Sequence, residues 1–371
     1  MHQTIDDSFR VMAASYLRRQ LRQLRRQFDG IRRAAEVEPV HQARVASRRL
    51  RAGLRVFGEC FPPEAVNRWT KEIRRVTRGL GKARDRDVQI GWLEGLLGAL
   101  TEPAHLPGLA RVLVRLERKR ERGQADVLKA LARFQQSGTL AEMRDATRRI
   151  LAVTRRRQAP IASVAVCQQA EWQLLERLDE FLQFQTSLDD PNDYQRHHAM
   201  RIASKRLRYT MEICRAAYRG GLDEPIAMMK RLQTLLGEIH DADVWVDYLG
   251  KVGDKERRRI IRRYGSEGPL ARIEAGIDWL RQACRCRRER LFAELVGLWQ
   301  ELARQNYWDE LLLTIRAPRP SDEAGGAAVP DASAGRFEPE QKPPQEDDDQ
   351  HGRAPTGEPR EVARMLDYGA N

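Results

Sequence analysis

Apolar residues recur every three or four positions along almost all of residues 1–316. This spacing puts apolar side chains on one face of an α-helix, whereas runs typical of β-strands are missing from the sequence. Turn signals such as Pro62-Pro63 and SLDDPN at 187–192 divide the stretch into successive helices. The sequence therefore predicts an all-α protein, and its 371 residues are enough for two domains or one large one.

One basic helix occurs twice. HQARVASRRLRAGLRVF at 41–57 matches HHAMRIASKRLRYTMEI at 197–213 when His41 is set on His198. At 100° per residue the basic side chains of each copy fall on one arc, opposite an apolar one. These residues are His41, Arg44, Arg48, Arg51 and Arg55 in the first copy, and His198, Arg201, Lys205 and Arg208 in the second. Glu212 stands where Arg55 stands. A merely solvated face usually mixes charges, because like charges one turn apart repel, so the repeated stripe favours a binding face for an anion.

A second segment is also repeated. RRVTRGLGKARDRDV at 74–88 matches KRLQTLLGEIHDADV at 230–244, and the glycines Gly81 and Gly237 predict helix ends. Arg75, Arg78 and Arg231 extend the basic stripe onto these helices. The stripe is weaker in the second copy, because Thr234 and Glu238 replace Arg78 and Lys82.

Four aspartates follow the glycines: Asp85 and Asp87 in the first copy, and Asp241 and Asp243 in the second. We favour Asp85 and Asp241 as N-caps of new helices, which accept free backbone N–H groups. Asp87 and Asp243 fit a role in orienting arginine side chains. Metal binding or acid–base chemistry is the third interpretation, and it is disfavoured because Arg84 stands where a second ligand histidine would be needed.

Charge divides the chain. The whole carries +13, but residues 317–371 hold 12 acidic and 6 basic side chains, so residues 1–316 carry +19. A body this basic indicates a polyanionic partner. Residues 317–371 are rich in Pro, Gly and acidic residues and are expected to be a disordered tail, with PREVARMLDYG as a possible docking element for a protein partner.

The remaining features concern location and domain organisation. The five cysteines show no CxxC pair and fit reduced, buried thiols, and no metal or other cofactor is expected. No apolar signal or membrane-length run occurs, which predicts a cytoplasmic protein without membrane insertion. RRRQAP at 155–160 is the expected connection between two helical halves, residues 1–158 and 159–316.

The paired motifs, His-x-x-Arg-Val/Ile-x-x-Arg/Lys-Arg-Leu-Arg followed by Leu-Gly-x-x-Arg/His-Asp-x-Asp-Val, resemble the CHAD family, the conserved histidine α-helical domain. The resemblance covers about residues 5–315. It implies two four-helix-type bundles related by pseudo-two-fold symmetry around a basic central channel, binding of inorganic polyphosphate, and association with polyphosphate granules. It also implies that the basic residues of both motif helices form the channel wall, with Arg75, Arg78 and Arg231 assigned there less firmly.

Two functions fit these features. The first is non-catalytic binding of polyphosphate, for which the planar fork of arginine and a hydrogen bond from histidine are suited. The alternative is a nucleic-acid-binding or nucleoid-associated protein using the same groove. Single-strand binding usually interleaves aromatic residues with basic ones, and only Tyr209 borders the basic arcs, so nucleic acid is expected to bind more weakly. An enzyme is not expected, because the sequence has no phosphate-binding GxxxxGK[ST] loop.

Overall fold

The computed structural model describes residues 6–34, 36–155 and 163–318, and within these ranges the chain forms helices without strands. The prediction of an all-α protein is confirmed. The α-helices are α1 (Asp7–Arg26), α2 (Phe28–Arg33), α3 (Glu38–Val56), α4 (Pro63–Gly98), α5 (Leu106–Gln136), α6 (Thr139–Arg155), α7 (Val164–Leu182), α8 (Tyr194–Cys214), α9 (Asp223–Tyr264), α10 (Ala271–Arg304) and α11 (Tyr307–Ile315). Short 3₁₀ turns join several of them: η1 (Gly58–Cys60), η2 (Pro103–His105), η3 (Gln185–Asp189), η4 (Arg215–Tyr218) and η5 (Gly268–Leu270).

Local capping chemistry starts several helices. The carboxylate of Asp6 accepts a hydrogen bond of 2.9 Å from the Ser8 amide at the start of α1. Asp193 does the same for the Arg196 amide at 3.0 Å, which begins α8 directly after the Asp-Asp-Pro-Asn break. Each bond satisfies one of the free N–H groups of a first helical turn, which stabilises the start of the helix.

The helix ends expected at Gly81 and Gly237 are wrong, because α4 and α9 run through both glycines. A glycine inside a helix costs only about 1 kcal/mol relative to alanine, and burial of neighbours such as Leu80 and Leu236 outweighs that cost. Gly81 packs beside α3, where a Cβ would make ordinary van der Waals contact with Nε of Arg44 at 3.5 Å.

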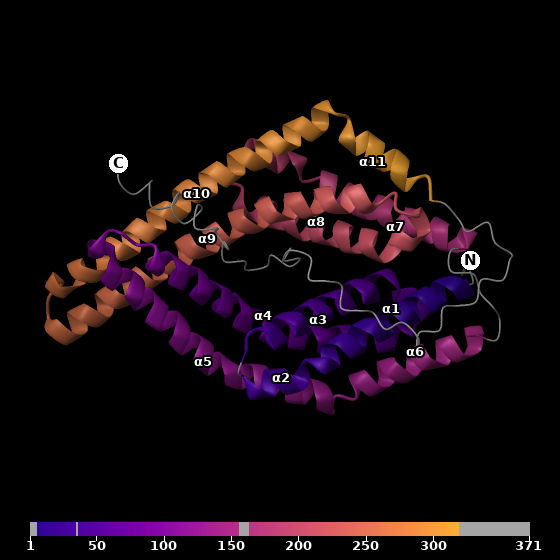
Figure 1. The fold of residues 1–371 in the computed structure, drawn as a ribbon, viewed down its shortest axis with the longest axis horizontal. Helices are drawn as coiled ribbons and strands as arrows, with labels where there is room; N and C mark the ends of the chain where they lie inside the picture. The colour runs from indigo at the N-terminus through magenta and orange to yellow at the C-terminus, as the bar shows by residue number, and fades with distance from the viewer. Residues whose placement is uncertain (1–5, 35, 156–162, 319–371) are drawn as a thin grey trace.

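Figure 1 shows α1–α6 on one side of the molecule and α7–α11 on the other. The α4–α5 and α9–α10 pairs reach to the same end, at the left of the view, where α5 packs against α10. Two hydrophobic clusters form the core, and each contains residues from both sides. The smaller lies at the shared end and includes the Trp92–Trp245 pair, whose ring centroids are 4.8 Å apart.

Some predictions fall on other parts of the chain. The connection expected at 155–160 lies almost wholly outside the described residues, as does the tail from residue 319 onward. The division into halves at residue 158 and the pseudo-two-fold relation stay predictions. None of the helices described in residues 6–34, 36–155 and 163–318 has both the length and the apolar character needed to cross a membrane.

Backbones touch where the two sides meet. A Cβ built on Gly276 of α10 would lie 2.2 Å from the carbonyl oxygen of His105, and one on Gly108 of α5 would lie 2.4 Å from that of Ile273. Backbone atoms cannot move aside as a flexible side chain can. The absence of a side chain at these two positions therefore sets how closely α10 approaches α5 and the turn before it.

We expect Gly276→Ala to lower the free energy of unfolding by about 1–3 kcal/mol or more, because the added methyl group overpacks a backbone contact. Gly297→Ala is the matched control, since it lies on the same helix with nothing within 4 Å of its would-be Cβ. That substitution should raise stability by about 0.5–1 kcal/mol through helix propensity. Urea denaturation of both variants is the measurement, and equal effects would contradict the close-contact argument.

Candidate functional site

A cavity of about 610 Å³ lies between α3 and α4 on one side and α8 and α9 on the other. Two carboxylates, Asp85 and Asp241, and two histidines, His198 and His240, line it. Nine cationic side chains complete its charged wall: Arg44, Arg48, Arg51, Arg55, Lys82, Arg86, Arg201, Lys205 and Arg206. With neutral histidines and ionised carboxylates, nine positive charges against two negative ones give the wall +7. We call it the basic cavity.

The amphipathic pattern of α3 places four of these cations. Ala43, Ala46 and Leu50 are at most 2% exposed and pack into the larger hydrophobic cluster. The arginines at 44, 48, 51 and 55 occupy the other face, one helical turn apart, and all four line the cavity. Burial of the apolar face thus fixes the rotation of the helix, and the rotation brings the arginines together.

Asp85 lies at the level of Arg44. Its Oδ1 is 3.6 Å from Nη2 of Arg44, whose side chain is only 8% exposed. About half of the Asp85 side chain (53%) remains open to the cavity, and the rest is covered by the surrounding protein. This burial raises the pKa of Asp85 although the Arg44 charge opposes the rise. The pair therefore holds one arginine of α3 against α4.

Tyr209 connects α3 to α8. Arg48 donates a hydrogen bond to the Tyr209 hydroxyl, and its Cζ lies 5.4 Å from the centroid of that ring. Cζ of Arg208 lies 4.7 Å from the same centroid. Such cation–π contacts hold guanidinium groups without neutralising them. The tyrosine therefore positions Arg48 and leaves its positive charge in the cavity.

Burial, reinforced by like charges, depresses the pKa values of the bases on α8 and α9. Burial, with help from Arg201, lowers the pKa of His240 to about 3 and also lowers that of His198. The Nδ1 atoms of these two rings are 3.3 Å apart. The pKa of Lys205 is lowered far below its usual range, first by burial and then by Arg201 and Arg48. In the empty cavity, each further proton is disfavoured by the charges already present.

The pKa values of Asp241 and Arg201 are also shifted, in both cases mainly by burial. Burial raises the pKa of Asp241 to about 7, although Arg201 and Lys205 oppose it. Burial, then the charges of Arg48 and Arg44, lower the pKa of Arg201 to about 10, although Asp241 opposes them. Arg201 stays charged near neutral pH because even this lowered pKa lies well above it.

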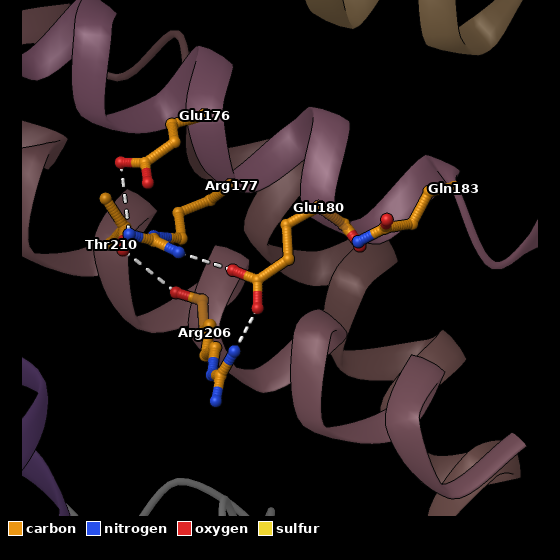
Figure 2. Close-up of polar contacts among 6 residues, drawn as sticks. All are labelled: Glu176, Arg177, Glu180, Gln183, Arg206 and Thr210. Carbon is orange, nitrogen blue, oxygen red and sulfur yellow. Dashed lines mark hydrogen bonds and ion pairs between the residues drawn. The ribbon is translucent and has the colours of Figure 1, made fainter. Parts of the chain in front are cut away.

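At the opposite end of the motif helices, Glu180 of α7 binds an arginine of the cavity wall (Figure 2). It accepts hydrogen bonds from Arg206 of α8 and from Arg177, which also lies 3.1 Å from Glu176. Burial alone would raise the pKa of Glu180, but the two arginine hydrogen bonds outweigh it and lower the pKa. Burial lowers the pKa of neighbouring Arg55 to about 10, with Arg206 adding to the effect. Glu180 therefore holds the guanidinium group of Arg206 in place. Because Glu180 itself is not part of the cavity lining, the lining keeps its excess of positive charge.

Nine of the sixteen residues predicted from sequence line the basic cavity: Arg44, Arg48, Arg51, Arg55, Asp85, His198, Arg201, Lys205 and Asp241. The other seven lie outside its lining: His41, Arg75, Arg78, Asp87, Arg208, Arg231 and Asp243. Arg75 bonds instead to Glu72 one turn away on α4. Arg208 is buried and donates to Gln233 at 2.9 Å and to Glu212 at 2.5 Å.

The N-cap role predicted for Asp85 and Asp241 is wrong, because both lie inside continuous helices whose backbone amides are already bonded. Asp87 and Asp243, for which a role in orienting arginines was predicted, each contact an arginine of a neighbouring helix. Asp87 bonds to Arg120 of α5, and Asp243 accepts a hydrogen bond of 2.7 Å from Arg288 of α10. These ion pairs hold the α4–α5 and α9–α10 pairs together.

Glu212 does not weaken the basic cavity. It lines a different cavity, of about 580 Å³, which includes Tyr16, Arg49 and Lys230. Its contact with Arg208 shows that the last part of the α8 stripe turns away from the basic cavity. Glu212 and Arg55, which match in the sequence repeat, therefore line different cavities.

Sequence reasoning missed six residues of the wall that bear on its chemistry: Lys82, Arg86, Arg206, Tyr209, His240 and Trp245. Arg206 stands inside the repeated motif, but the helical wheel of α8 alone favoured Arg208. Arg86 comes after Gly81, which was predicted to end a helix. Its place in the wall could be predicted only if α4 were known to continue past that glycine.

The CHAD domain family model matches residues 15–250, and the chain belongs to this family, which is generally associated with polyphosphate. Two solved structures are similar to this chain. The CHAD domain from the plant Ricinus communis is 21% identical with a TM-score of 0.48, over 86% of this chain and 96% of that one. PptA from Streptomyces chartreusis is 19% identical with a TM-score of 0.52, over 78% of this chain and 98% of that one. No curated protein matches the sequence.

Carboxylates, histidines and cysteines do not gather into a group of three or more that could hold a metal ion anywhere in the described part of the chain. His198, His240 and Asp241 come from two helices and face cations instead. The chemistry on this wall is therefore hydrogen-bond donation and positive charge, which suit an anionic ligand.

We expect Arg51→Gln to leave the free energy of unfolding within about 0.5 kcal/mol of the parent or slightly above it, because the change relieves like-charge repulsion. Burial and the nearby Arg74 and Arg48 charges lower the pKa of Arg51, which is the sign of that repulsion. Leu50→Ala, the neighbour on the buried face, should cost about 2–5 kcal/mol. Urea denaturation compares the two. A loss for Arg51→Gln as large as that for Leu50→Ala would make this arginine structural.

Proposed function

We propose that this protein binds inorganic polyphosphate, without catalysis, in the basic cavity. The observation that carries the proposal is the convergence of nine cations from three helices, α3, α4 and α8, onto one cavity whose described lining has two carboxylates. Hydrophobic packing holds these charges together although they repel. A chain of phosphates supplies closely spaced negative charge with no bases or sugars to accommodate.

A buried donor supports the same ligand. Arg201 is 4% exposed, and its Nε atom finds no hydrogen-bond acceptor among the residues that the structure describes. Leaving a buried charged donor unsatisfied costs about 1–3 kcal/mol or more. A phosphate oxygen in the cavity would accept from it, and this gain would appear only when the ligand is bound.

The aromatic residues of the wall favour polyphosphate over single-stranded nucleic acid. The Tyr209 ring is already in contact with the guanidinium groups of Arg48 and Arg208. Trp245 is 5% exposed and packs against Trp92. Base stacking needs an open aromatic face, and neither ring offers a free platform of the usual kind. The wall can therefore bind phosphates but gains little from bases.

The direct test titrates the full chain with polyphosphate and with single-stranded DNA at several salt concentrations. Polyphosphate should bind more tightly, and by analogy with DNA its log K should fall linearly with log salt by nearly one unit per neutralised phosphate. Arg51→Gln should weaken polyphosphate binding by about 1 kcal/mol or more, as loss of a charged hydrogen bond does. Arg290→Gln, an exposed position on α10, serves as the control for net charge. Equal affinity for DNA, or equal losses in both variants, would refute the proposal.

Binding should tighten as the pH falls from 8 to 6. A bound polyanion raises the pKa of every titrating group in the wall, so His198, whose pKa is depressed in the empty cavity, gains a proton more readily. Asp241, with a pKa of about 7, also becomes neutral more readily. Each proton taken up strengthens binding by up to about tenfold per pH unit.

Asp241→Asn isolates one of these protons. The variant should bind polyphosphate more tightly than the parent at pH 8, where the carboxylate would repel the ligand, and nearly equally at pH 6. Calorimetry in buffers of different ionisation enthalpy counts the protons directly, and the variant should take up fewer. Weaker binding by Asp241→Asn at both pH values would instead show that its charge positions Arg201.

A further inference from the structure

A second group of cations lies outside the basic cavity, towards the end of the molecule where α5 meets α9. Six side chains line a small cavity of about 190 Å³ there: Arg111, Arg115, Arg118, Lys119 and Arg122 of α5, and Arg259 of α9. All six are cationic, and no carboxylate is among the described residues of this lining. We call this group the α5 cluster. Neither the family match nor the repeated motifs assign it a role, since it lies outside both motifs.

The geometry of α5 concentrates the charge. At 100° per residue, the arginines at 111, 115, 118 and 122 fall within an arc of about 60°. Asp126, one turn after Arg122, lies about 20° beyond one edge of the arc, and Glu121 lies about 60° beyond the other. Four like charges on one stripe repel, as they do on α3. Between residues 111 and 122 the arc itself holds no acid, which differs from the mixed pattern of an ordinary solvated helix face.

One buried carboxylate fixes part of the cluster. Glu256 of α9 is 2% exposed and accepts a hydrogen bond of 3.0 Å from Arg111, and Arg115 also binds it. Burial alone would raise the pKa of Glu256, but these two arginines outweigh it and lower the pKa. Glu256 balances one of the six charges and presets two guanidinium groups. Arg118, Lys119, Arg122 and Arg259 remain exposed beside them.

A tyrosine links the α5 cluster to the basic cavity. Cζ of Arg86, in the wall of the basic cavity, lies 5.6 Å from the Tyr248 ring centroid. Nζ of Lys119, in the α5 cluster, lies 4.3 Å from the same centroid. The two cations are therefore no more than about 10 Å apart, since both distances end at one point. Partial burial, then the Arg86 charge, lower the pKa of Lys119 to about 8.

We infer that a polyphosphate chain too long for the basic cavity leaves it past Arg86 and continues over Lys119 onto the α5 cluster. The inference rests on the proposed function and adds a length preference to it. Binding a second stretch of the same chain is an intramolecular event, so it strengthens binding without a second ligand. Short chains occupy the basic cavity alone. The protein should consequently discriminate between polyphosphates by their length.

The test compares tripolyphosphate with long-chain polyphosphate for the parent and for the Arg118→Gln, Arg122→Gln double variant. The double variant should lose at least about tenfold in long-chain affinity and about one unit of salt slope for each lost phosphate contact. Its affinity for tripolyphosphate should stay unchanged. Arg148→Gln, Arg149→Gln removes the same charge from exposed positions on α6 that line neither cavity, and it should behave as the parent with both ligands.

The outcomes separate the two proposals. If neither polyphosphate binds the parent, the proposed function fails and the length preference fails with it. If both bind but the double variant weakens them equally, or weakens neither, the route over α5 is wrong and the basic cavity stands. Arg259→Gln repeats the test from α9 and should reduce long-chain affinity selectively, so a folding defect in the double variant would not leave the question open.

Discussion

Burial of the apolar faces of α3 and α8 is the interaction on which the rest of the structure depends. Leu50 and Leu207 are completely buried, and each contributes about 1.5–3 kcal/mol by leaving water. Repulsion between cations one turn apart costs only a few tenths of a kcal/mol per pair. Packing therefore wins by a wide margin and forces Arg48 and Arg201 onto one cavity. As a result, burial and the neighbouring cations lower the pKa values of Arg201 and Lys205 in the wall.

The carboxylates around the cavity follow from the same balance. Asp85 and Glu180 each bind an arginine of the wall, while Asp87 and Asp243 bind Arg120 and Arg288 on neighbouring helices. A carboxylate that accepts one or two of the five N–H groups of a guanidinium fixes the orientation of that group. The remaining N–H groups can then donate to a ligand. Too many acids would neutralise the wall. The observed pattern keeps the arginines ordered and the cavity positive.

The sequence predicted what a single helix can determine and missed what depends on its neighbours. Arg44, Arg48 and Arg51, which share one arc on the wheel of α3, all line the basic cavity, because the apolar side of that helix faces a continuous core. On α8 it chose Arg208, yet Arg206 lines the cavity while Arg208 is buried against Gln233. A wheel cannot tell which part of a polar arc meets another helix. The helix ends expected at the two glycines failed for a similar reason, since packing along α4 and α9 outweighs a local preference.

The continuity of α4 has a consequence for binding. One unbroken helix carries Arg86 in the basic cavity and Trp92 in the hydrophobic cluster at the shared end of the molecule. A break after Gly81 would have let Arg86 and Trp92 move independently of Leu80 and the larger hydrophobic cluster, and ordering them would have reduced affinity. Because α4 and α9 pass through both regions, the spacing between the cavity and the end of the molecule is set before any ligand arrives. A polyanion that reaches along this surface therefore meets cations whose positions are already fixed, and most of its interaction with them remains available as binding energy.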